Sequence, residues 1–317
     1  MSELPKCQTP KWEPTYDYPA TIEAVEAQHN IFWLPTEPKV EKDLHCIKTE
    51  LTEAERHGVL TTLKLFTLYE QIAGHEYWGG RFKRMFPRQD FRRMAACFAN
   101  VEVNIHAPFY QRVDELLGLN TDEFYNSFAD DPVLKSRMDF LDNCVADKDD
   151  LFSVASFSLV EGCILYSSFA FLMHFQAEGK NKITNIHSGL TFSCKDENLH
   201  ARAGAWAFNT LLKEKLELDY DGLDKLKERI NEAAETIKEH EFCIIDKIFE
   251  KGKIVGTTDK QLKNFVLSRL DLCLEDLGLQ KVYKPKYNPI AKWFYNMLGG
   301  DSQHDFFAKL GSSYNRN

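Results

Sequence analysis

The feature that most constrains the fold is an apolar stretch between Asp150 and Glu178, in which Glu161 is the only Asp, Glu, Lys or Arg. As a helix, this stretch is long enough to cross a bilayer. Serines near its middle, the central glutamate and the lack of a second such stretch instead favour a helix buried inside a bundle. We therefore expect a buried core helix and no membrane span.

The rest of the chain also has helical periodicity. After residue 50, apolar side chains recur every three or four positions, and alternating β-branched runs are absent, which predicts an all-helical protein. Helices are expected over residues 52–86, 90–118, from 132 onward, 151–176, 183–216, 223–250 and 259–277. We expect a single domain over residues 1–317, with an N-terminal extension over 1–50 and a looser tail over 280–317.

Composition excludes several classes of function. The net charge is -9 and basic residues are scattered, which argues against nucleic acid as a partner. The eight cysteines form no CxxC pair, and the N-terminus lacks the apolar core of a signal peptide. A cytoplasmic protein with reduced thiols is the expectation.

Four of the expected long helices carry an acid where the pattern calls for an apolar residue. These acids and two nearby histidines are Glu70, Glu102 with His106, Glu161, and Glu197 with His200. An unpaired carboxylate in an apolar interior is costly, and shared cations would remove the cost. A helical bundle binds two metal ions when two helices each offer one glutamate and two others each offer a glutamate and a histidine one turn on.

Helix geometry supports both glutamate–histidine pairs. A separation of three residues falls roughly 60° short of a full turn and one of four exceeds it by about 40°, so each pair shares a helix face. Carboxylates with two imidazoles suit iron or manganese better than zinc or calcium. The sequence therefore predicts a dinuclear metal site and leaves the choice between iron and manganese open.

The sequence "VEVNIHAPFY", residues 101–110, places a proline inside an expected helix. Pro108 lacks the backbone N–H that would reach carbonyl 104, and this loss favours a π-type bulge. A bulge would let Glu102 and His106 face one metal although they are four residues apart. In the alternative, Val103 occupies the ligand place and the site has lost a carboxylate.

Several longer motifs resemble the small, radical-generating subunit of class I ribonucleotide reductase over nearly the whole chain. They are "NIFWLPTE", "LFTLYE", "CFANVE", "VEGCILYSSFAFL", "DENLH" and "KYNPIAKW", in the family's order and near its spacings. The resemblance implies a ferritin-like bundle with two metal ions, most simply two irons, with manganese–iron or two manganese ions as alternatives. It also implies a ribonucleoside-diphosphate reductase activity exerted with a large subunit, and a homodimer.

The resemblance also implies roles for single residues. Glu70, Glu102, His106, Glu161, Glu197 and His200 would be the metal ligands. Tyr110, four residues after His106, would carry the radical. Trp33 and Asp196 would belong to the electron relay from the large subunit, and Tyr314 would be its mobile tyrosine.

Three departures from the family pattern stand out. Glu70 replaces the usual aspartate, and Glu102-x-x-x-His106 replaces the usual E-x-x-H. Only "NRN" follows Tyr314, where relatives carry a tail that docks on the large subunit, so either docking through another surface or dependence on an unusual partner is expected.

Two other classes of function compete with this interpretation. A related dinuclear oxidase acting on a lipid or small molecule would normally lack the radical tyrosine, so Tyr110, Trp33 and Asp196 argue against it. A ferritin-like metal store or a metal-free scaffold would leave Glu161 in need of a different compensating partner.

Overall fold

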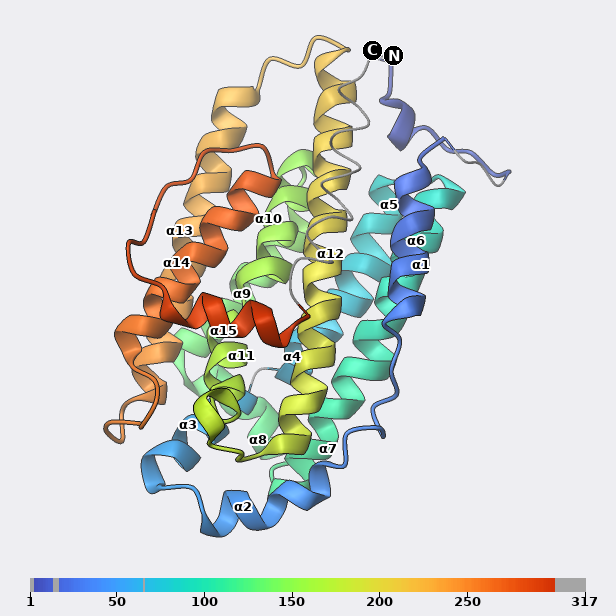
Figure 1. The fold of residues 1–317 in the computed structure, drawn as a ribbon. Coiled ribbons are helices and arrows are strands. Elements are labelled where there is room, and N and C mark those ends of the chain that lie inside the picture. The colour runs from blue at the N-terminus through green and yellow to red at the C-terminus, as the bar shows by residue number, and fades with distance from the viewer. Residues whose placement is uncertain (1–2, 14–16, 65, 300–317) are drawn as a thin grey trace.

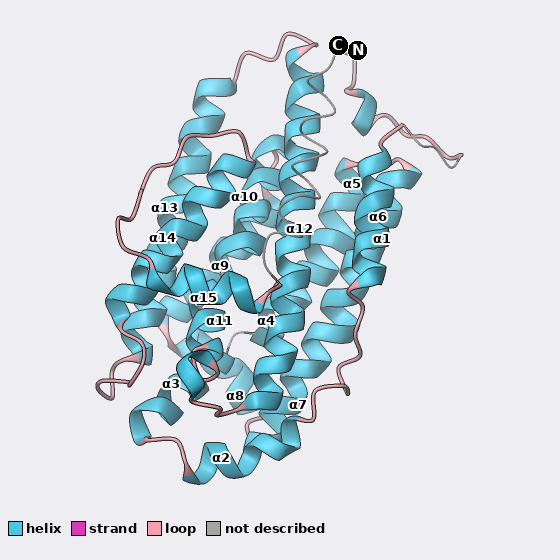
Figure 2. Ribbon diagram, viewed as in Figure 1, coloured by secondary structure: helices cyan, strands magenta, loops and turns pink. Residues whose placement is uncertain are grey.

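The computed structural model describes residues 3–13, 17–64 and 66–299, and in these ranges the chain is a helical bundle without strands (Figure 2). A single isolated bridge pairs Lys11 with Arg88. The α-helices are α1 Pro19–Asn30, α2 Leu44–Thr49, α3 Glu53–Leu63, α4 Phe66–Gln71, α5 Lys83–Met85, α6 Gln89–Val101, α7 Ala107–Leu117, α8 Asp122–Asn126, α9 Pro132–Ala146, α10 Asp150–Cys163, α11 Tyr166–Met173, α12 Thr184–Leu216, α13 Leu223–Ile248, α14 Asp259–Asp276 and α15 Pro289–Met297. The all-helical prediction is confirmed.

Two π-helical segments and four short 3-10 turns complete the described structure. The π segments are η3 Ile72–Phe82 and η4 Glu102–His106. The 3-10 turns are η1 Lys6–Gln8, η2 Val40–Asp43, η5 Ser127–Asp130 and η6 Ala177–Gly179. Both π segments continue directly from one α-helix into the next, so they widen the helices without ending them.

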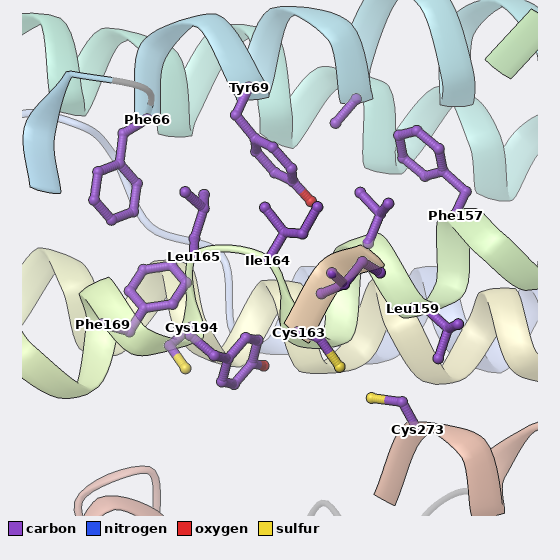
Figure 3. Packing of buried hydrophobic residues seen from close by; sticks show 14 of the residues in the cluster. Phe66, Tyr69, Phe157, Leu159, Cys163, Ile164, Leu165, Phe169, Cys194 and Cys273 are labelled. Carbon is purple, nitrogen blue, oxygen red and sulfur yellow. The ribbon is translucent and has the colours of Figure 1, made fainter. Parts of the chain in front are cut away.

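Helix α12 runs along the length of the molecule, with α13 and α14 on one side and α1 and α6 on the other (Figure 1). The segments α4–η3, α6–η4–α7, α10–α11 and α12 enclose the centre. Buried apolar side chains from all of them form one continuous core. Figure 3 shows part of it, where Phe66 of α4 faces Phe169 of α11 with ring centroids 5.4 Å apart.

Helix starts follow from capping residues that the sequence carries. Thr52 and Glu55 form a complete capping box at α3, as their spacing predicted. Asp131 accepts from two backbone N–H groups at the start of α9, and Asp149 does the same at α10. The expected helices over 223–250 and 259–277 are confirmed as α13 and α14 within two residues at each end.

Two expected helices are interrupted in the structure, and one segment expected to be loose contains a helix. The helix expected over 52–86 is interrupted after α3 and then passes into the long π segment η3. The helix expected over 151–176 breaks at Ile164 and Leu165, where Leu165 has φ 73°, and resumes as α11. The tail expected to be loose after residue 280 contains α15, which starts with an Asn288 cap and Pro289.

The apolar stretch Asp150–Met173 is, within the described residues, long and apolar enough to cross a membrane. The whole of its apolar window is buried inside the bundle. It packs as a core helix, interrupted at Leu165.

One buried carboxyl outside the centre gives a prediction about stability. Asp114 of α7 is fully buried beside Thr67 and Tyr125, whose hydroxyls lie 3.5 and 3.4 Å from its Oδ2. Burial raises the pKa of Asp114 to about 7. Below the unfolded pKa, both folded and unfolded states hold this proton. As pH rises from about 4 to 7, the Asp114 carboxyl loses its proton in the unfolded chain before it does so in the folded protein. The free energy of unfolding therefore falls over this range.

Replacing this residue, Asp114→Asn, removes the charge while keeping the side-chain shape. We expect the variant to be more stable than wild type by about 1–3 kcal/mol at pH 8, and nearly equal to it at pH 4. Thermal unfolding at both pH values measures this, with Glu123→Gln on the exposed side of α8 as the control. A variant that is less stable at pH 8 would contradict the assignment.

Candidate metal centre

The six side chains predicted as ligands converge at the centre of the bundle, and all are buried. They form two overlapping groups in which the donor atoms lie within 4.8 Å of one another. One group is Glu70, Glu102, His106 and Glu197, and the other is Glu102, Glu161, Glu197 and His200. Because Glu102 and Glu197 belong to both groups, the arrangement is suited to two neighbouring cations that share two carboxylates.

A π turn places Glu102 and His106 on the same side of their helix. The backbone N–H of Ala107 donates to the carbonyl of Glu102, five residues earlier, which is the π-helical bond. Pro108 follows immediately in the first turn of α7. The distortion inferred from Pro108 is therefore present, and it aligns two residues that are four apart.

The same turn answers which of residues 102 and 103 faces the centre. Glu102 lies in both donor groups and is fully buried. Val103 instead points at Gly74 of η3, where an added Cβ would come within 2.4 Å of the valine Cγ2. Gly74 therefore allows the two π segments to approach, and Glu102 occupies the place at the centre.

Each histidine turns Nδ1 toward the glutamates of the cluster and Nε2 toward a residue outside the cluster. His106 Nδ1 lies 2.9 Å from Glu102 Oε2, and its Nε2 lies 2.9 Å from Asp196 Oδ2. His200 Nδ1 lies 2.5 Å from Glu102 Oε1. Its Nε2 lies 3.0 Å from the side-chain oxygen of Gln28. Asp196 and Gln28 thus accept from Nε2–H, so Nδ1 is the atom that each ring would offer to a metal in place of its proton.

The buried glutamates at the centre repel one another and would be stabilised by cations. Burial, followed by the charges of Glu197 and Glu102, raises the pKa of Glu70 and of Glu161. Burial acts to raise the pKa of Glu102 too, but the charges of His106 and His200 hold it well below its usual range. Both oxygens of Glu70 and of Glu197 lack a hydrogen-bond donor among the described residues. Buried donors of this kind fit a site for two metal ions.

Glu161 differs from the other acids because a tryptophan fixes one of its oxygens. Trp78, fully buried in η3, donates its indole N–H to Glu161 Oε1 at 2.8 Å. The other oxygen, Oε2, has no hydrogen-bond donor among the described residues and lies 4.0 Å from His200 Nδ1. One oxygen of Glu161 is thereby oriented, and the other remains available to a cation.

Two of the remaining predicted residues adjoin the centre. Tyr110 is buried on α7, the helix that continues from the π turn, and stacks on Phe66 at 4.4 Å. Trp33 donates its indole N–H to Asp196 Oδ2 at 2.8 Å, and the same oxygen lies against His106. Trp33, Asp196 and His106 therefore form one hydrogen-bonded chain. The predicted relay residue Tyr314 lies outside the described residues.

Comparison with known proteins decides the family. The family model "Ribonucleotide reductase, small chain" matches residues 12–289. The chain belongs to the ribonucleotide reductase small-chain family. A small subunit of this kind is an oxidoreductase component that works with a large subunit.

Named relatives agree with this assignment. The small subunit is 26% identical to the ribonucleoside-diphosphate reductase subunit beta of Chlamydia pneumoniae, over 89% of this chain and 83% of that one. It is 25% identical to the ribonucleoside-diphosphate reductase subunit M2 of Danio rerio, over 90% of this chain and 70% of that one.

Solved structures establish the fold of this small subunit. A putative class I ribonucleotide reductase of Bacillus halodurans superposes with a TM-score of 0.78 at 20% identity, covering 88% of this chain and all of that one. The dimanganese(II)-NrdF of Streptococcus sanguinis gives a TM-score of 0.78 at 19% identity, covering 92% and 99%. The prediction of a ferritin-like bundle is confirmed.

Three residues of the small subunit that contact predicted site residues were not found from the sequence. Gln28 holds His200, Trp78 holds Glu161, and Ser193 bonds Tyr110. Single glutamines, tryptophans and serines are common on helices, so none of them forms a motif. In each case the sequence offers only one side chain with a polar group on a buried helix face, which is a weak indication of a site.

Proposed function

We propose that this small subunit uses a dinuclear metal centre to oxidise Tyr110 to a radical, which the large subunit then draws on to reduce ribonucleoside diphosphates. The observation that carries the proposal is the continuous arrangement from Trp33 through Asp196 and His106 to a carboxylate cluster with Tyr110 beside it. Neither a metal store nor a scaffold requires that chain of hydrogen bonds.

The donor groups suggest how six ligands divide between two ions. Glu70 and His106 would hold one ion, Glu161 and His200 the other, and Glu102 and Glu197 would bridge them. We propose two irons, with manganese in one or both places as alternatives, because carboxylates with two imidazoles suit both metals. A metal pair held there would supply a one-electron oxidant derived from oxygen or a reduced oxygen species.

The protein's own side chains would position the reactants. Asp196 accepts from His106 Nε2–H and from the indole of Trp33, so one carboxylate joins a ligand to the relay. Phe66 and Phe109 line the ring of Tyr110 and keep water from it. We further propose that Tyr314 continues the relay, that the chain is one domain forming a homodimer, and that it acts in the cytoplasm.

Removing the Tyr110 hydroxyl tests the proposal. Metal-free protein is loaded with iron, manganese or both, exposed to oxygen or superoxide, and examined by metal analysis and electron paramagnetic resonance. Wild type should show a tyrosyl signal, and Tyr110→Phe should bind two metals but show none, because phenylalanine has no phenolic proton to lose. Nucleotide reduction with the large subunit should vanish in parallel.

A second buried tyrosine provides the control. Tyr77 is fully buried, and its hydroxyl has no hydrogen-bond partner among the described residues. Tyr77→Phe should therefore keep the signal. A signal that persists unchanged in Tyr110→Phe would refute Tyr110 as the radical site.

A further inference from the structure

Among the described residues, the hydroxyl of Tyr110 has one hydrogen-bond partner, Ser193. The two oxygens lie 2.8 Å apart, and both side chains are buried. The rest of the Tyr110 ring meets Phe66 at 4.4 Å and Phe109 at 5.0 Å between centroids. Among the described residues, one polar contact therefore orients the phenol oxygen, and aromatic rings cover the side chain.

The backbone is arranged so that this contact can form. Gly189 lies one turn before Ser193 on α12, and an added Cβ there would come within 2.3 Å of the Phe109 ring. The missing side chain lets α7 approach α12 closely at this level. Tyr110, the next residue after Phe109, then reaches Ser193 directly.

Serine suits both oxidation states of the tyrosine. A phenol both donates and accepts a hydrogen bond, whereas a phenoxyl radical has lost its proton and only accepts. The serine hydroxyl also donates and accepts, and its hydrogen turns about the Cβ–Oγ bond. Ser193 can therefore accept from Tyr110 before oxidation and donate to it afterwards without moving a heavy atom.

We propose that Ser193 is the positioning residue that donates a hydrogen bond to the oxidised Tyr110. The inference rests on the proposed function. Oxidation would break the Tyr110 O–H bond, and the oxygen-derived oxidant that the loaded centre supplies would take up both the electron and the proton. Ser193 keeps its own proton and turns it toward the phenoxyl oxygen.

The hydrogen bond leaves a spectroscopic signature that activity does not report. In protein exchanged into D2O, the wild-type radical should show hyperfine coupling to one exchangeable deuteron. Ser193→Ala should still form the radical, but the coupling should disappear and the largest g-value should rise, since a donated hydrogen bond lowers that value. Ser193→Thr, which keeps the hydroxyl, should restore both.

Thr191 supplies a matched control on the same helix. Its hydroxyl bonds the carbonyl of His187 at 2.9 Å, so Thr191→Val removes a helix hydroxyl without touching Tyr110. This variant should keep the coupling. Metal-free protein labelled with ¹³C at tyrosine Cζ gives a second measurement: the resonance missing from Tyr110→Phe should shift in Ser193→Ala and stay in place in Thr191→Val.

The possible failures are distinguishable. A radical that retains its deuteron coupling in Ser193→Ala would overturn the Ser193 assignment alone. A Cζ resonance that stays in place in the metal-free variant would do the same. Loaded wild type with no tyrosyl radical at all would overturn the proposed function, and this inference with it.

Discussion

Replacing Glu102 with alanine should leave the protein unable to hold its metal pair. Glu102 lies in both donor groups and within 3 Å of both histidines, so its loss removes a donor from each metal position at once. Changes in residues that merely orient a ligand typically cost 10–100-fold in metal affinity, so loss of a shared ligand should cost more than about 100-fold. Metal analysis after gel filtration should find far less than two ions per chain.

The neighbouring position offers the matched control. Val103→Ala removes two methyl groups next to Gly74 and no metal-binding atom, so this variant should load normally. Full loading of Glu102→Ala would remove Glu102 from the ligands and would favour a site that has lost a carboxylate.

Trp33→Phe should abolish nucleotide reduction and leave the metal centre and its radical intact. The substitution removes the indole N–H that donates to Asp196, together with the more easily oxidised ring of the proposed relay. Asp196 still accepts from His106, so the ligand keeps its orientation. The measurement pairs the radical signal with turnover in the presence of the large subunit.

An exposed tryptophan controls for loss of tryptophan in general. Trp12 has 78% of its surface exposed, and Trp12→Phe should retain both the radical and turnover. Trp33→Phe protein that turns over at the wild-type rate would remove Trp33 from the relay. Loss of the radical in Trp33→Phe would instead show that Trp33 acts on the metal centre.

Convergence of the six candidate ligands could be predicted from sequence because buried charge is rare. Glu161 lies in a stretch with no other acid, Lys or Arg, and helix spacing aligns each glutamate with its histidine. Their role as ligands stays a prediction. The π turn could also be predicted, because Pro108 lacks the N–H that an α-helix requires there.

The break between α10 and α11 and the contacts that support the predicted ligands could not be predicted from local sequence. Ile164 and Leu165 carry no helix-ending signal, and a positive φ at a leucine such as Leu165 is rare. Gln28 contacts His200 across 172 residues of sequence, so local pattern does not reveal it. Helix α15, by contrast, starts with a signal that the sequence does carry, since Asn288 caps it and Pro289 follows in the first position.

The break after α10 links Glu161 to helices outside the four that surround the metal centre. The carbonyl of Gly162, next to Glu161, accepts from Nε and Nη2 of Arg269 on α14 at 3.0 and 2.9 Å. Arg269 is itself placed by the ring of Tyr166, 4.0 Å away, and by the hydroxyl of Tyr295 on α15. Hydrogen bonds through one guanidinium therefore connect α15 to the backbone of the residue next to Glu161, so a predicted ligand is anchored from outside the four segments that surround it.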